Sequence, residues 1–129
     1  MDLSQRTETF GQDDASWLGS DHGTSMARSI TLDVSAFTAA THYPDGYFPS
    51  GLPLGQITAS GKYGPFTADA TDGTQTLAGF LLTSVDAPDV NTTDVVGALL
   101  DHGRVIVDRL PVDFDPADAT APSCHVIFA

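Results

Sequence analysis

The side chains that could carry out chemistry are scattered along this chain. Its four histidines, His22, His42, His102 and His125, all stand alone, and none lies within four positions of another. No single strand or helix can therefore present two imidazoles to one metal ion. The spacing favours ordinary surface or half-buried histidines, and we expect neither a metal site nor a cofactor.

Three acids near the C-terminal end, Asp113, Asp115 and Asp118, loosely resemble a calcium-binding loop. Such a loop needs a central glycine and a terminal bidentate glutamate, and both are missing here. Pro116 also restricts the backbone. The same residues fit helix capping better, with Asp115 as the N-cap of a helical turn that begins at Pro116.

Catalytic motifs are absent from the sequence. Ser50-Gly51 and Ser60-Gly61 do not form the Gly-x-Ser-x-Gly elbow of a hydrolase, and no glycine-rich loop precedes Lys62 with phosphate-binding spacing. Sixteen of the seventeen acids are Asp, so chance carboxylate pairs are common and none stands out. We expect a protein that is not an enzyme, with a small acyl or nucleotide hydrolase as the least favoured alternative.

The charge and the cysteine count exclude several partner classes. A formal net charge of −12 with five Lys and Arg argues against nucleic acid and against acidic membrane surfaces. Cys124 is the only cysteine, so there is no internal disulfide, and its apolar neighbours predict a buried, inert thiol. No apolar stretch approaches a membrane span, and the N-terminus lacks the features of a signal peptide. We expect a soluble protein made inside the cell.

Two regions differ in composition. Residues 1–28 are polar, with isolated large apolar side chains at Phe10, Trp17 and Leu18. We interpret this region as an extended N-terminal arm that orders on a partner, because such a segment cannot offset its ordering entropy alone. The alternative for Trp17 is packing on its own domain. Residues 29–129 are expected to form one β-rich domain.

The second region has the pattern of short strands joined by tight turns. Alternation in Ser29–Val34 predicts a strand, and Pro44-Asp45-Gly46 predicts a turn. Further expectations are a hairpin of 54–59 with 63–68, an apolar strand over 76–85, a hairpin of 95–100 with 104–110, and a final strand over 125–128. The predicted fold is mainly β, a compact β-clip or barrel-like domain with little helix.

Two stretches resemble a known family. In Gly64–Leu82 an acidic-Gly turn, Asp72-Gly73, leads into the strand Ala78-Gly79-Phe80-Leu81, and Leu99–Pro111 follows with similar order and spacing. Both resemble the head decoration, or capsid cement, proteins of tailed bacteriophages of the phage lambda type. Thr7-Glu8-Thr9-Phe10 resembles a short piece of that family's N-terminal arm. Residues 29–49 and 112–123 could not be mapped onto the family.

The resemblance implies a structural virion protein, made in the host cytoplasm, on the outer surface of an expanded icosahedral capsid. It would bind the major capsid protein as a homotrimer at three-fold positions and resist the pressure of packaged DNA. Thr7, Glu8, Thr9 and Phe10 would pair with a capsid strand by β-augmentation, while Trp17 and Leu18 would fill an apolar recess. Deleting the first twenty-odd residues would then abolish shell binding and leave the domain folded.

A receptor- or carbohydrate-binding β module of a virion or cell surface is the second alternative. It would need an exposed aromatic platform, which Tyr43, Tyr47 and Phe48 could form within one loop. The prolines and glycines around these aromatic residues point instead to a packed corner.

Overall fold

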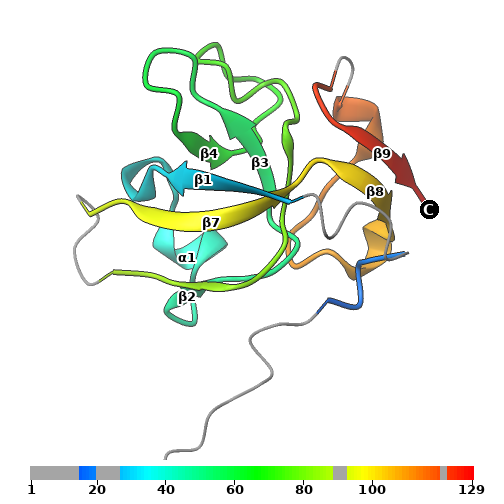
Figure 1. The fold of residues 1–129 in the computed structure, drawn as a ribbon, viewed down its shortest axis with the longest axis horizontal. Helices are drawn as coiled ribbons and strands as arrows, with labels where there is room; N and C mark the ends of the chain where they lie inside the picture. Colours follow the sequence, from blue (N-terminus) through cyan, green and yellow to red (C-terminus); the bar gives the residue numbers. More distant parts are fainter. Residues whose placement is uncertain (1–14, 20–26, 89–92, 120–121) are drawn as a thin grey trace, which may run out of the picture.

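The computed structural model describes residues 15–19, 27–88, 93–119 and 122–129. The described residues form nine short strands and one α-helical turn, α1 (Ala39–His42), so the expectation of a mainly β fold is confirmed (Figure 1). Three single turns of 3-10 helix lie at Val34–Ala36, Val107–Arg109 and Pro116–Asp118. Within these ranges no helix has the length and apolar character that crossing a bilayer requires.

Five strands close into a small barrel in the order β1-β4-β3-β5-β7. The longest pairing is antiparallel and joins β1 to β7 from Arg28↔Leu99 to Leu32↔Val95, and a parallel bridge, Leu32↔Tyr63, closes the barrel between β1 and β4. The barrel strands are β1 (Arg28–Leu32), β3 (Pro53–Gln56), β4 (Tyr63–Pro65), β5 (Gly79–Leu81) and β7 (Val95–Leu100).

Two smaller sheets flank the barrel. β2 (Tyr47–Phe48) pairs antiparallel with β6 (Val85–Asp86), and β8 (His102–Val105) pairs parallel with β9 (His125–Phe128). The β8–β9 sheet lies at one end of the molecule, where the chain also ends (Figure 1).

Strands β5 and β7 separate two hydrophobic cores. Because successive side chains in a strand point to opposite faces, Leu81 and Leu99 enter one core while Phe80 and Leu100 enter the other. The first core fills the barrel. The second lies between the barrel and the β8–β9 sheet and contains the buried residues Trp17, Leu77, Phe80, Leu100, Val105 and Cys124. Burial on both faces explains why the chain is so apolar around β5.

Several local predictions are confirmed. β3 and β4 form the expected hairpin, and Gly61 takes a positive φ of 74° in its turn. Asp115 caps the 3-10 turn that begins at Pro116, where its side chain accepts a hydrogen bond from the Ala117 amide. The expected final strand is β9.

Two predictions about strands are wrong. β7 and β8 do not form a hairpin, because β1 and β5 already occupy both edges of β7, and only Asp101 separates β7 from β8. A two-residue loop is the shortest common hairpin connection, so the chain leaves the barrel at Asp101 and pairs elsewhere. The strand expected over 76–85 is instead divided between β5 and β6, which belong to different sheets.

Candidate functional site

The β8–β9 sheet has one inward and one outward face. Val105, Val126 and Phe128 pack against the second core. The four alternate side chains are exposed and form what we name the β8–β9 outer face: His102, Arg104, His125 and Ile127. Cross-strand neighbours on this face are His102 with His125, whose ring centroids are 6.1 Å apart, and Arg104 with Ile127.

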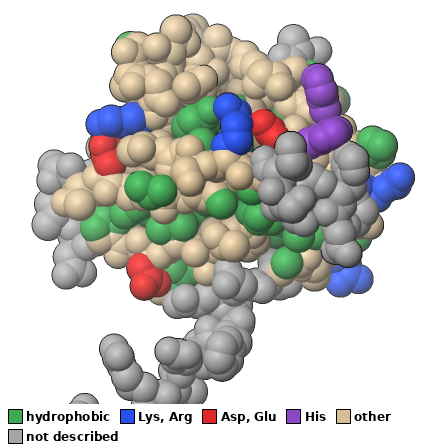
Figure 2. Space-filling view, in the orientation of Figure 1, with side chains coloured by type: hydrophobic (Ala, Val, Ile, Leu, Met, Phe, Trp, Pro, Cys, Tyr) green, Lys and Arg blue, Asp and Glu red, His purple; other side chains and the backbone are tan. Residues whose placement is uncertain are grey.

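The outer face is basic and apolar in an otherwise acidic protein. None of its four side chains is a carboxylate, although the chain has seventeen acids and only five Lys and Arg. Figure 2 shows two histidine side chains side by side at the end where β8 and β9 lie, with an acidic side chain on one side of them and hydrophobic and basic side chains on the other. Ile127 is 59% exposed, one of the two most exposed large hydrophobic residues in the described ranges. Such a face is suited to contact with an acidic protein surface.

The N-terminal segment 15–19 runs along the edge of β8 that faces away from β9. Leu18 forms an antiparallel bridge with Val105. The Gly19 amide donates to the Arg104 carbonyl at 2.9 Å, and the Ile106 amide donates to the Trp17 carbonyl at 2.7 Å. The segment is therefore held along the free edge of β8 by one isolated bridge and two backbone hydrogen bonds.

Trp17 is completely buried in the second core of its own domain. Its ring lies 5.8 Å from that of Phe80, and its indole Nε1 donates a hydrogen bond to Ser50 Oγ at 3.0 Å. Of the two interpretations of Trp17, packing on its own domain is the one seen here. Leu18 is half-buried and packs on the same core.

The remaining predicted arm residues, Thr7, Glu8, Thr9 and Phe10, lie outside the described residues, as does His22. Residues 15–19 of the predicted arm are attached to the β domain by the bonds given above.

The outer edge of β9 is open with respect to the described residues. The amides of His125 and Ala129 donate to the Asp101 and Val105 carbonyls on the β8 side. Because backbone groups alternate along a strand, the amides of Val126 and Phe128 point to the opposite edge. No segment in the described ranges pairs along that edge.

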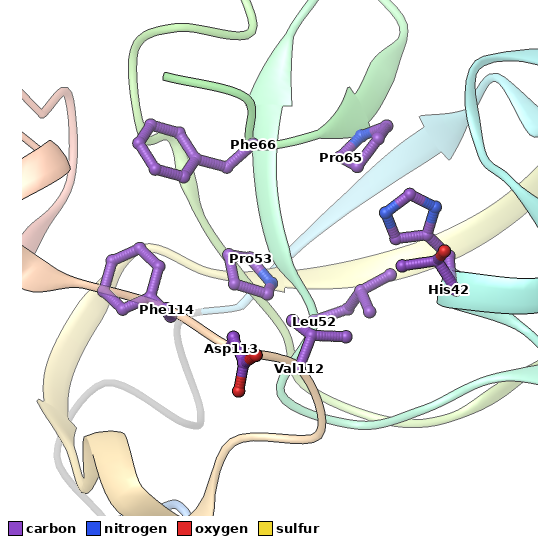
Figure 3. A pocket seen from close by; sticks show the side chains of 9 residues that line it. His42, Leu52, Pro53, Pro65, Phe66, Val112, Asp113 and Phe114 are labelled. Atoms are coloured by element: carbon purple, nitrogen blue, oxygen red, sulfur yellow. The ribbon is translucent and has the colours of Figure 1, made fainter. Parts of the chain in front are cut away.

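A recess of about 230 Å³ lies between β3, β4, α1 and the segment after the Val107–Arg109 turn (Figure 3). Its lining is largely apolar, with His42, Thr41 and Asp113 as its polar members. The apolar members are Leu52, Pro53, Pro65, Phe66, Val112 and Phe114. Pockets for small ligands are usually larger, about 300–1,000 Å³, so the recess is better matched to one side chain.

His42 is held at one end of this recess. Its Nδ1 accepts a hydrogen bond from the Thr38 amide at 2.8 Å, so Nε2 carries the proton of the neutral ring. Partial burial lowers the pKa of His42 below its ordinary value. The ring is therefore neutral at pH 7 and can act as a hydrogen-bond donor.

Cys124 is buried next to β9, as expected from its neighbours. Burial raises the pKa of its thiol to about 11, which keeps it protonated and unreactive at neutral pH. The described ranges contain no group of three or more His, Cys, Asp or Glu side chains that could hold a metal ion.

The aromatic loop considered for ligand binding is a packed corner. Phe48 is completely buried, with ring centroids 4.9 Å from Phe37 and 4.8 Å from Tyr43. Tyr47 is half-buried. The loop does not present the exposed platform that the carbohydrate-binding alternative requires.

Comparison with protein families matches residues 23–122 to the family described as Bacteriophage lambda head decoration protein D. The chain belongs to this family. It is therefore a structural protein of a bacteriophage capsid, associated with the virion. A search of curated proteins finds no match.

The family match extends beyond the resemblance found in the sequence. It includes residues 29–49 and most of 112–123, which could not be mapped by motif, and covers strands β1 to β8. Thr7–Phe10 and β9 lie outside the matched range. Sequence reasoning missed the β8–β9 outer face because its four residues lie on one face only once β8 pairs with β9. No local sequence pattern predicts this pairing.

Proposed function

We propose that this head decoration protein binds the outer surface of an expanded icosahedral capsid as a homotrimer at three-fold positions. Its partner is the major capsid protein, and its role is to stabilise the shell against the pressure of packaged DNA without catalysis. The observation that carries this proposal is the family match over residues 23–122.

The N-terminal arm makes the shell contact in this proposal, with Thr7, Glu8, Thr9 and Phe10 adding a strand to a capsid sheet. The attachment of residues 15–19 supports it, since Leu18 makes an isolated antiparallel bridge with Val105 at the edge of β8. The buried Trp17 gives the arm a fixed root. A capsid contact made by the arm is thus linked to the second core through the buried Trp17 side chain.

Thermodynamics accounts for the stabilising effect. A protein that binds only the expanded shell shifts the equilibrium toward that state by mass action. Three linked arms on one trimer would add avidity without any new contact. The net charge of −12 fits a position outside the shell, where the protein does not meet DNA.

A deletion test must spare Trp17. Removing the first twenty-odd residues would also remove a core side chain, so loss of binding could reflect unfolding. Deletion of residues 2–14 leaves Ala15–Gly19 in place. We expect this variant to keep the circular dichroism spectrum and thermal midpoint of the full chain and to lose co-sedimentation with expanded capsids depleted of decoration protein.

Phe10→Ala in the full chain is the matched point variant, expected to weaken co-sedimentation, with Gln12→Ala as the control that binds normally. The full chain should also raise the temperature at which depleted shells release DNA. A folded 2–14 deletion that still binds would remove the arm from the proposal. Failure of the full chain to bind any depleted shell would contradict the decoration function itself.

A further inference from the structure

We propose that the β8–β9 outer face of one copy docks into the recess of the next copy, in a head-to-tail contact. Ile127 would enter the recess, and Arg104 would pair with Asp113 at its rim. This inference rests on the proposed homotrimer and assigns the surfaces that hold it together.

The projecting half of the contact is Ile127 with its cross-strand neighbour Arg104. Ile127 is 59% exposed, and its side chain points away from the second core, opposite to Phe128. Arg104 is exposed beside it, and no ion pair is found for its guanidinium among the described residues. An aliphatic side chain beside an exposed cation is matched by an apolar recess with an acidic rim.

The recess has these properties. The side chains of Leu52, Pro53 and Val112 lie between the rings of Phe66 and Phe114 at one end and His42 at the other (Figure 3). Its volume of about 230 Å³ can hold one branched aliphatic side chain. Asp113 lines it and is exposed.

Charge complementarity extends beyond this pair. The segment that carries Asp113 has one exposed cation, Arg109, and four exposed carboxylates: Asp108, Asp113, Asp115 and Asp118. The β8–β9 outer face has one guanidinium, two imidazoles and no carboxylate. Opposite potentials on the two surfaces favour their approach and fix its direction, whereas like surfaces repel.

One copy cannot make this contact with itself. Phe114, at the recess, packs 5.5 Å from Phe128 on the inner side of β9, while Ile127 points to the outer side. The contact must therefore join different surfaces of two copies. Such a heterologous contact forms a closed ring when the rotation between copies completes a circle, and a three-membered ring is the proposed trimer.

The test is the mass of the purified full chain in solution, measured by light scattering after size exclusion over a range of concentrations. We expect the unmodified chain to be trimeric. Arg104→Glu, Asp113→Arg and Ile127→Asp should each raise the concentration at which the trimer dissociates by at least about tenfold. The double variant Arg104→Glu with Asp113→Arg should recover the trimer, because the pair is restored with its signs exchanged.

Matched controls carry the same changes elsewhere on the surface. Asp69→Arg reverses an exposed charge, and Val96→Asp alters the other highly exposed hydrophobic residue, on β7. Both should remain trimeric, and thermal midpoints should show that every variant is folded.

Trimers that persist in the three test variants, or a charge-exchanged double variant that stays dissociated, would overturn the assigned contact alone. Dissociation of the control variants would also overturn it. An unmodified chain that is monomeric at every concentration would overturn both the contact and the trimer, while shell co-sedimentation tests the decoration function separately.

Discussion

Trp17 Nε1 donates a hydrogen bond to Ser50 Oγ at 3.0 Å, and Ser50 Oγ donates in turn to the Leu82 carbonyl at 2.6 Å. This short chain of bonds joins the N-terminal segment to the barrel. Both side chains are buried, so neither can exchange its partner for water without opening the core. The polar, arm-like region therefore contains a structural residue of the domain.

Replacing Trp17 should be among the most destabilising single changes in the described core. We expect Trp17→Ala to lower the free energy of unfolding by about 3–5 kcal/mol, since a large buried ring is lost. Trp17→Phe should cost less, because a ring remains next to Phe80 while Ser50 Oγ loses its donor. Urea unfolding followed by circular dichroism measures both, and a loss below about 1 kcal/mol for Trp17→Ala would contradict this burial.

Gly51 should be sensitive to a single added methyl group. Its φ is +94°, and a Cβ there would lie 2.8 Å from the Trp17 ring and 3.0 Å from Pro111 Cδ. Gly46 provides the matched control, with φ +85° and no atom within 4 Å of the same Cβ. Gly46→Ala should cost only the left-handed strain, about 1–2 kcal/mol. Gly51→Ala should cost clearly more in thermal unfolding, and equal losses would refute the close contact with Trp17.

The Cys124 thiol should resist modification in the folded protein. With a pKa of about 11 instead of 9.0, its thiolate fraction at pH 8 falls by about two orders of magnitude. Burial slows attack further. Reaction with a chromogenic disulfide reagent should therefore be at least about a hundredfold slower than in urea-unfolded protein, and rates within tenfold of each other would show that the thiol is accessible.

His42 should make the protein less stable in mild acid. Its folded-state pKa lies below the ordinary value of 6.5, so the unfolded chain binds more protons between these two values. The contribution of His42 to the free energy of unfolding is fully present above pH 6.5, and it is lost as the pH falls through the folded-state pKa of His42.

His42→Gln keeps an acceptor for the Thr38 amide but does not titrate. Unfolding free energies of the two proteins, measured by urea titration from pH 7.5 to 5, should diverge toward low pH, with the histidine protein losing more stability. Parallel curves would mean that the neutral ring is not favoured by folding.

The features that sequence reasoning predicted correctly depend on local chemistry. Gly46 and Gly61 adopt positive φ in the turns expected of them, and Asp115 caps the turn at Pro116. In each case the decisive contacts lie within a few residues of one another. The mainly β class follows from alternation of apolar residues, which is equally local.

The features that were missed depend on contacts between distant residues. The pairing of β7 with β1 and β5 prevents the hairpin expected between 95–100 and 104–110. Trp17 is buried through contacts with Ser50 and Phe80, which lie far along the chain. Nothing in the composition of residues 1–28 distinguishes an aromatic residue that binds a partner from one that packs on its own domain.

The parallel pairing of β8 with β9 has a consequence for the order of folding. During synthesis from the N-terminus the barrel can close once β7 is available, but β8 must wait for the whole of Ile106–Cys124 before its neighbour arrives. Parallel strands linked by long connections pair slowly. The entropy cost of closing the connecting loop comes before the strand pairing can offset it. A nascent chain that has not yet reached β9 can thus hold a complete barrel and still lack the β8–β9 sheet, so this sheet forms after the barrel.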